Sequence, residues 1–211
     1  FMAAGIIDHE CGTRDMRRLN GLWKYMPVTA VLGIVAAAAM AGVPLLNGFL
    51  SKEMFFTETL GGEGGGPVHW WLPAGATIAG LFSVAYSVRF IHDVFFNGEP
   101  VDLPKKPHEP PRFMRLPVEV LVVLCVLVGV FPALTIGPLL AVGAQAAVFG
   151  GPNGSLPAYT LAIWHGFNLP LAMSMVATAG GLALYFGLQR RVNLHRRSEE
   201  RRVGKECRSR W

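Results

Sequence analysis

Charged side chains are scarce in this sequence, and three long stretches have none. Asp, Glu, Lys and Arg make up 16% of the 211 residues, while apolar residues make up 52%. An average soluble domain carries about a quarter charged residues. No Asp, Glu, Lys or Arg occurs in residues 25–51, 64–88 or 120–189. Each stretch can supply a helix of about 20 residues, enough to cross a bilayer, and the last can supply two.

This lack of charge excludes an ordinary soluble domain and predicts an integral membrane protein. A cleaved signal peptide does not explain the pattern, because there are several apolar runs and none has a short apolar core followed by a cleavage site. The predicted fold class is all-α: a polytopic bundle of four to five membrane-spanning helices.

Cysteine is also rare, and the motifs of cofactor binding are missing. Cys11, Cys125 and Cys207 have no metal-ligand spacing, so we expect no disulfide and no metal site. Cys125 lies among Val and Leu and is interpreted as a small apolar residue. No nucleotide, flavin, quinone or metal motif is visible. We therefore expect no cofactor, and the sequence does not favour an autonomous enzyme.

The formal charge of +5 depends on the last 15 residues. Arg197–Trp211 (RSEERRVGKECRSRW) matches the in-frame translation of a common short-read sequencing adapter, and we expect that it is not part of the protein. The alternative is a solvated basic tail. Without this segment, 13 of the 19 basic and 11 of the 14 acidic residues remain, a balance of +2 that gives no argument for nucleic acid. Because the chain opens on Phe1 with helical character, we expect an internal fragment of a longer protein.

The segment from Pro27 to Leu60 is too long for one straight crossing. A continuous helix of that length would span about 50 Å, whereas the hydrocarbon core is about 30 Å thick. Pro44, Asn47 and Gly48 together are a break signal. The sequence therefore predicts either two spans or one discontinuous helix broken near Pro44–Gly48. Broken helices inside membranes expose backbone dipoles and commonly mark ion sites.

Lys52 is the leading candidate site residue, with Glu53 beside it. Both follow the first charge-free stretch directly, and Met54, Phe55 and Phe56 continue the apolar run. An ionisable group at membrane depth costs a few kcal/mol or more and is usually functional. The alternative is that Lys52 reaches the interface with its ammonium while Glu53 faces water.

Arg89, His92 and Asp93 form a second polar group near the end of the span predicted for residues 72–96. Arg89 and Asp93 are four residues apart and can pair on one helix face. For Asp93 we favour a simple interfacial position, and for Arg89 and His92 both an interfacial and a functional role stay open. Further spans are predicted for residues 116–131 and 168–188.

The distribution of Lys and Arg predicts which loops are cytoplasmic. The loop of residues 97–115 and the region after residue 188 are basic, whereas residues 61–67 and 150–167 contain no Lys or Arg. The first loop, residues 8–25, is also basic. It is cytoplasmic only if residues 27–60 cross the membrane once, because two crossings would place it outside. The sequence leaves this conflict open.

Four ordered blocks resemble a known family. They are GTRDMRRLNGLWKYMPVTA, AGVPLLNGFLSKEMFF, YSVRFIHDVFF and LAIWHGFNLPLAMS. The first three are similar to the antiporter-like membrane subunits shared by two systems, namely the A subunit of Mrp-type multisubunit sodium/proton antiporters and the L subunit of respiratory complex I. The fourth block resembles the Mrp-type A subunit specifically. The resemblance covers residues 1 to about 191.

The resemblance implies a proton relay. In that family the lysine of the GFxSK motif lies in a discontinuous helix and loads and releases protons; Lys52 matches it, Glu53 matches the neighbouring acidic residue, and Arg89 matches the family arginine. Upstream family motifs with a histidine, a lysine and a carboxylate–lysine pair are absent here. We therefore expect the chain to hold the far end of a proton path and not to transport alone.

The remaining candidates and alternatives are less specific. Glu119 is either a cavity carboxylate or an interfacial residue, and His9 and His165 are either relay residues or structural ones. The favoured function is a proton-translocating subunit of a monovalent cation/proton antiporter in the bacterial inner membrane, with lipid, other subunits, protons and sodium as partners. The alternatives are the proton-pumping L subunit of an NADH:quinone oxidoreductase and a non-catalytic structural membrane subunit.

Overall fold

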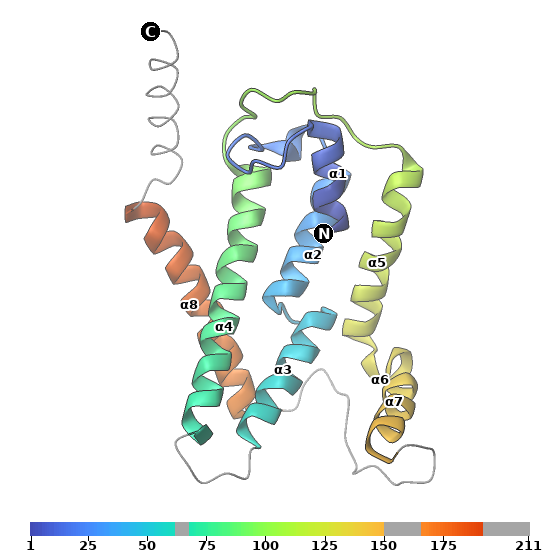
Figure 1. Cartoon of the computed structure of the whole chain (residues 1–211), viewed down its shortest axis with the longest axis vertical. Coiled ribbons are helices and arrows are strands. Elements are labelled where there is room, and N and C mark those ends of the chain that lie inside the picture. Colours follow the sequence, from blue (N-terminus) through green and yellow to red (C-terminus); the bar gives the residue numbers. More distant parts are fainter. Residues whose placement is uncertain (62–67, 150–165, 192–211) are drawn as a thin grey trace.

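A computed structural model describes residues 1–61, 68–149 and 166–191, and this part of the chain is helical with no β-strand (Figure 1). The elements in chain order are α1 (Met2–Cys11), η1 (Leu22–Lys24), α2 (Pro27–Ala41), α3 (Asn47–Leu60), α4 (Val68–Ile91), the π-helix η2 (His92–Phe96), α5 (Arg112–Val130), α6 (Pro132–Thr135), α7 (Gly137–Phe149) and α8 (Leu169–Arg191). The all-α prediction is confirmed.

Three of these helices are long and apolar enough to cross a membrane: Trp70–Phe96, Arg112–Val130 and Leu169–Leu188. They agree with the spans predicted from the charge-free stretches to within a few residues. Only 11–22% of the apolar windows in these helices are buried inside the protein. Large apolar side chains such as Phe113, Leu121 and Val123 are exposed. Such surfaces suit lipid or neighbouring subunits rather than water.

The predicted helix break is present between α2 and α3. Pro27 opens α2, where the missing N–H of proline costs nothing. The helix ends at Gly42, whose φ of 80° is left-handed and whose N–H bonds back to Ala38 and Ala39. Leu45 also has a positive φ, 72°, a strained conformation for a residue other than glycine. In Figure 1, α3 resumes below α2 along the same direction.

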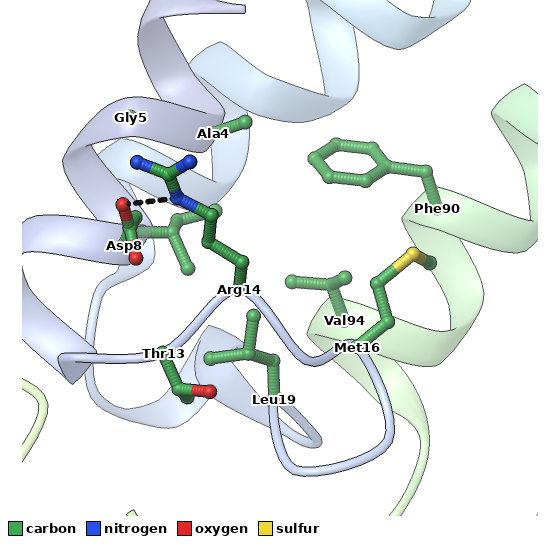
Figure 2. Close-up of a pocket in the computed structure, with 10 residues that line it drawn as sticks. Ala4, Gly5, Asp8, Thr13, Arg14, Met16, Leu19, Phe90 and Val94 are labelled. Atoms are coloured by element: carbon green, nitrogen blue, oxygen red, sulfur yellow. Dashed lines mark hydrogen bonds and ion pairs between the residues drawn. The ribbon is translucent and has the colours of Figure 1, made fainter. Parts of the chain in front are cut away.

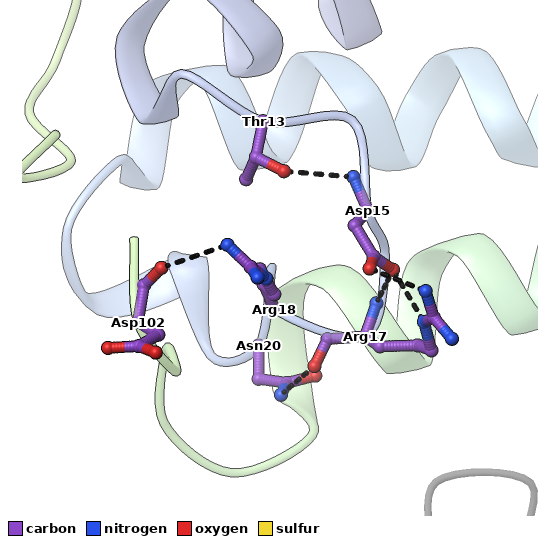
Figure 3. Close-up of polar contacts among 6 residues, drawn as sticks. All are labelled: Thr13, Asp15, Arg17, Arg18, Asn20 and Asp102. Carbon is purple, nitrogen blue, oxygen red and sulfur yellow. Dashed lines mark hydrogen bonds and ion pairs between the residues drawn. The ribbon is translucent and has the colours of Figure 1, made fainter. Parts of the chain in front are cut away.

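The two basic loops lie side by side, which bears on the conflict over the first loop. The Val101 N–H donates to the Arg18 carbonyl at 3.2 Å, and the Lys105 N–H donates to the Cys11 carbonyl at 3.4 Å. Figure 3 shows the Arg18 guanidinium reaching the Asp102 carbonyl, at 3.4 Å. Residues 12–26 and 97–111 therefore share one end of the bundle. This arrangement favours a single broken crossing by α2 and α3, in which both basic loops agree with a cytoplasmic position.

The best-packed core lies at this same end. Cys11, Leu22, Met26 and Ala30 are completely buried there, together with Phe95, which is 1% exposed. Further along the bundle, α4 packs most extensively on α8. A Cβ at Gly181 would lie 2.7 Å from the Leu81 carbonyl oxygen, so only glycine allows the two helices this close. This approach brings side chains of α8 onto the polar end of α4.

Candidate functional site

Lys52 lies at the helix break, on the first turns of α3. Its Nζ donates a hydrogen bond to the carbonyl oxygen of Ala41, the last residue of α2, at 3.2 Å. It also lies 5.9 Å from the centroid of the Phe56 ring, one turn further along α3. Carbonyl groups at a helix end lack partners within the helix and carry partial negative charge, so they attract a cation. The break therefore creates the acceptor that holds the ammonium.

Two glycines make room for the lysine side chain. A Cβ at Gly42 would lie 2.7 Å from Lys52 Cδ, and a Cβ at Gly80 of α4 would lie 3.3 Å from Lys52 Cε. The side chain thus lies between the end of α2 and the middle of α4. A third glycine, Gly48, sets the packing of the two half-helices, because a Cβ there would overlap the carbonyl oxygen of Ala39.

Lys52 borders a cavity of about 440 Å³ between α2, α3 and α4. The polar residues that line it are Asn47, Ser51, Lys52 and Ser83. Ser83 donates to the Met40 carbonyl at 3.0 Å, and Asn47 accepts from the Cys125 thiol at 2.9 Å. Cys125 therefore ties α5 to the break as well as filling space. Glu53 is partly buried but is not among the lining residues, since consecutive helix positions point about 100° apart.

No ion pair to Lys52 occurs within residues 1–61, 68–149 and 166–191. Its charge is balanced by the Ala41 carbonyl at the end of α2 and by the Phe56 ring. Contacts of these two kinds typically stabilise a cation by about 0.3–2 kcal/mol each. Within the described residues, the Lys52 ammonium is therefore held by a carbonyl and a ring and not by a carboxylate.

Asp93, for which the sequence favoured an interfacial position, has a buried side chain at the basic-loop end of α4. Its side chain is 8% exposed and contacts Arg89 Nε at 3.4 Å, His92 Nδ1 at 3.4 Å and the Tyr185 hydroxyl of α8 at 3.0 Å. The predicted Arg89–Asp93 pairing is confirmed, and it lies within a larger group. Tyr185 could not be found from the sequence, because it is 92 residues from Asp93 and no pattern links the two.

The remaining candidates lie away from the Lys52 cavity. Glu119 pairs with Arg115 at 3.5 Å on the first turns of α5, and His9 contacts the neighbouring Glu10 at 3.0 Å. Neither residue lines the cavity of Lys52. His165 lies outside the described residues.

Glu109 is a further polar residue that could not be singled out from the sequence. It has no place in a helix or a motif, yet its carboxylate accepts hydrogen bonds from the Val28 N–H at 2.7 Å and the Thr29 hydroxyl at 3.1 Å. Met26, at the N-cap of α2, provides no side-chain cap, so Glu109 from the second loop serves instead. Arg115 holds the same carboxylate at 3.2 Å. The half-helix α2 therefore has an anion at its start and Lys52 at its end.

A second cavity, of about 370 Å³, lies between α1, the first loop and α4 (Figure 2). Apolar side chains including Ile7, Met16, Leu19, Phe90 and Val94 line most of it. Its ion pair, Arg14 with Asp8 at 2.7 Å, is largely exposed on the arginine side. Within the described residues no group of His, Cys, Asp and Glu has an arrangement that could hold a metal ion. The Lys52 cavity is therefore the stronger candidate for ion chemistry.

Comparisons with known proteins find similar antiporter subunits. Residues 1–65 match the family described as "NADH:quinone oxidoreductase/Mrp antiporter, TM". The probable K(+)/H(+) antiporter A/B subunit of Rhizobium meliloti (strain 1021) is 59% identical over 186 residues, which are 88% of this chain and 18% of that protein. The Na(+)/H(+) antiporter A subunit of Alkalihalophilus pseudofirmus (strain OF4) is 38% identical over 200 residues, covering 88% of this chain and 24% of that protein.

A solved structure is similar over nearly the whole chain. It is described as "Structure of Mrp complex from Dietzia sp. DQ12-45-1b", and it matches with a TM-score of 0.70 and 31% identity over 99% of this chain and 23% of the matched chain. The chain thus spans roughly a fifth to a quarter of the length of these relatives.

The helices and the site define a class: multi-pass membrane proteins that hold ionisable side chains inside a helical bundle. Within that class the chain is similar to the A subunit of Mrp-type antiporters, as its motifs indicated. Its first 65 residues match a family shared with the antiporter-like subunits of NADH:quinone oxidoreductase. The relatives are transporter subunits rather than self-contained enzymes.

Proposed function

We propose that the protein is the proton-translocating membrane subunit of a multisubunit monovalent cation/proton antiporter, and that Lys52 binds and releases the transported proton. The observation that carries this proposal is the position of the Lys52 ammonium on the Ala41 carbonyl, at the break between α2 and α3. Broken helices that present backbone dipoles to a cavity are a recurring design for ion sites in transporters.

The mechanism follows from the balance of charge around the lysine. Removal from water disfavours the ammonium, whereas the carbonyl end of α2 favours it. Because these opposing terms come from a cavity and a helix end, a modest change in either one shifts the balance between proton binding and release. An additional charge moving nearby in the assembled complex would act in the same way. Glu53, the adjacent carboxylate on α3, is proposed to contribute to this field.

The setting of this activity is a complex in the bacterial inner membrane. The chain spans only part of its relatives, so we expect transport from the assembled complex and not from this chain alone. Its partners are the other antiporter subunits and lipid. Relatives are named for both potassium and sodium exchange; the proposed substrate class is therefore a monovalent cation, with sodium as the first ion to test and potassium as the second.

Lys52 can be tested in the full-length complex in everted membrane vesicles, with cation-driven proton movement followed by a pH-sensitive dye. Lys52→Ala should lower exchange by about 100-fold or more, the usual contribution of a positioned proton-transfer group. Lys52→Arg is the sharper variant, because arginine keeps the positive charge but does not release its proton. A relay predicts that both variants fail, whereas a structural charge predicts rescue by Arg.

Lys106→Ala is the matched control, since this lysine lies on the exposed loop of residues 97–111 and lines neither cavity. It should exchange at the normal rate, and native gels should show all three variant complexes assembled. Normal exchange by Lys52→Ala would remove Lys52 from the mechanism.

The proton-pumping L subunit of NADH:quinone oxidoreductase is the alternative, because residues 1–65 match a family shared by both systems. The block that contains Trp164, His165 and Gly166 favours the antiporter. Purification of the native complex decides between them, since an oxidoreductase would bring flavin and iron–sulfur subunits with it. A structural subunit, the second alternative, predicts that Lys52, Arg89 and Glu119 can all be neutralised without loss of exchange.

A further inference from the structure

A buried carboxylate lies well away from Lys52, at the point where α4 becomes the π-helix η2. Asp93 Oδ1 accepts a hydrogen bond from the Tyr185 hydroxyl at 3.0 Å and lies 3.4 Å from His92 Nδ1, while Oδ2 faces Arg89 Nε at 3.4 Å. We call these four residues the Asp93 cluster. Single π-turns within α-helices are often found at functional sites. Here the π-helix carries both His92 and Asp93.

The cluster joins a partly exposed base to a buried acid through one hydroxyl group. The Tyr185 oxygen lies 2.9 Å from His92 Nδ1 and 3.0 Å from Asp93 Oδ1. The imidazole is 37% exposed, whereas the carboxylate is 8% exposed. A proton on His92 Nδ1 can pass to the Tyr185 oxygen as the tyrosine proton passes to Asp93. One proton then moves inward, and imidazolium and carboxylate become neutral imidazole and carboxylic acid.

The other charged groups near the cluster do not compete for this proton. Arg89 lies one helical turn before Asp93, and its Nε contacts the second carboxylate oxygen, Oδ2. On the loop side, η1 packs against η2 through Trp23 and Phe96, whose rings stack at 5.5 Å. The neighbouring Lys24 and Glu99 are exposed and face each other at 3.6 Å. The acid–base partners of Asp93 in the described residues are thus His92 and Tyr185.

Helix α4 connects this cluster with the lysine cavity. Gly80 packs against Lys52, and Asp93 follows 13 positions later, about 20 Å along the helix toward the basic loops. Ser83 lines the lysine cavity. Ser87, one turn further, is 1% exposed, and its hydroxyl has no hydrogen-bond partner among the described residues. Buried polar atoms of this kind are where proteins bind internal water.

We propose that the Asp93 cluster is a second proton-binding site, which takes up and releases protons on the side of the basic loops and exchanges them with Lys52 along α4 past Ser87. This inference rests on the proposed function of Lys52. It adds a carboxylate at the cytoplasmic end of the path and gives the contact between α4 and α8 a role, since Tyr185 comes from α8.

The test uses the same vesicle assay, measured from acid to alkaline pH. Tyr185→Phe keeps the aromatic ring against His92 but removes the hydroxyl, and it should slow exchange by roughly tenfold and move its pH optimum. Asp93→Asn, which cannot bind a proton, should lose exchange at every pH, and Asp93→Glu should restore part of it. Asp102→Asn is the matched control, because this carboxylate lies on the exposed loop at the same end and should leave rate and pH profile unchanged.

Ser87→Ala separates a relay from a structural role. The variant deletes a hydroxyl that supports no hydrogen bond within the described residues, so a structural role predicts normal exchange. A relay past Ser87 predicts exchange slowed several-fold in a fully assembled complex. Asp93→Asn leaves Arg89 without its partner and can impair assembly. If that complex does not assemble, Tyr185→Phe and Ser87→Ala decide whether the second site exists.

The inference and the proposed function can fail separately. The second site would be overturned if Tyr185→Phe and Ser87→Ala had wild-type rates and pH profiles while Lys52→Ala was inactive. That result would leave the proposed function of Lys52 intact. Normal exchange in Lys52→Ala would overturn the function itself.

Discussion

At the scale of single residues, glycine rather than charge determines whether Lys52 fits. A Cβ at Gly80 would lie 3.3 Å from Lys52 Cε, from Phe56 Cζ and from Ala177 Cβ, so three neighbours would have to move. Overfilling a packed site costs about 1–3 kcal/mol. We expect Gly80→Ala to assemble and to exchange roughly fivefold more slowly or worse, as measured by the vesicle assay.

Gly75→Ala provides the control on the same helix. A Cβ at Gly75 would meet nothing within 4 Å, and alanine is the better helix former by about 1 kcal/mol. This variant should exchange normally and be at least as stable. If Gly80→Ala and Gly75→Ala exchange at the same rate, the missing Cβ at Gly80 is not what lets Lys52 function.

Cys11 gives a second prediction at this scale. The residue is completely buried at the end of α1, and burial, with a smaller contribution from the Glu10 carboxylate, raises the pKa of its thiol to about 11. The reactive thiolate is therefore rare at pH 8 and increases only as the pH approaches 11. Alkylation of Cys11 by iodoacetamide in the purified complex should be slow at pH 8 and accelerate up to that pH.

Glu99→Cys supplies an exposed thiol for comparison, because Glu99 is 77% exposed. Its alkylation should level off near the ordinary thiol pKa of about 8.5. Rapid reaction of Cys11 at pH 8 would contradict the packing described for the end of α1.

The role of a single residue could be predicted only where it depends on neighbours in the sequence and not on contacts made in the fold. Lys52 could be singled out as a candidate because it interrupts an apolar run, a property of its immediate neighbours. The burial of Asp93 was not predicted, because it depends on Tyr185, which contacts Asp93 only when α8 packs on α4. Glu109 was missed for the same reason: it caps a helix that begins 82 residues earlier in the chain.

At the scale of elements, α2 depends on its two ends. Glu109 accepts hydrogen bonds from the first turn, and the last carbonyl accepts one from Lys52. Loss of a capping group typically costs about 0.5–2 kcal/mol. Glu109→Ala also leaves Arg115, whose side chain is 16% exposed, with one partner fewer. We expect this variant to melt a few degrees lower in a thermal-shift measurement on the complex, with less exchange but an unchanged pH optimum.

Glu99→Ala is the matched loop variant for this effect. Its pair with Lys24 is exposed at both ends and, at 3.6 Å, contributes little to stability. No change in melting is expected. Equal melting of the Glu99→Ala and Glu109→Ala complexes would mean that the cap on α2 does not stabilise the half-helix.

The break between α2 and α3 shows what could and could not be predicted for an element. Pro44, Asn47 and Gly48 located it to within a few residues, because such residues end helices in any context. The geometry inside the break could not be predicted. Leu45 has a left-handed backbone and lies where α5 packs tightly against the break, since a Cβ on Gly129 of α5 would lie 2.6 Å from Leu46 Cα. Local sequence alone favours no such conformation for a leucine.

At the scale of the whole molecule, the charge-free stretches were sufficient to predict the long helices, but sidedness needed tertiary contacts. The distribution of Lys and Arg allowed two placements for the first loop. The hydrogen bonds between residues 12–26 and 97–111 favour one, in which α2 and α3 cross the membrane once between them.

This topology can be tested by labelling single cysteines in intact cells with a membrane-impermeant maleimide. Arg17→Cys and Lys105→Cys, in the two basic loops, should both be protected in intact cells and labelled in everted vesicles. Gly61→Cys, at the far end of α3, should show the opposite pattern, because one broken crossing separates it from Arg17. Labelling of Arg17→Cys and Gly61→Cys from the same side would mean that α2 and α3 each cross the membrane. In that arrangement the Ala41 carbonyl and the Lys52 ammonium would no longer lie at the middle of one crossing, and the lysine would lose the helix end that holds its charge.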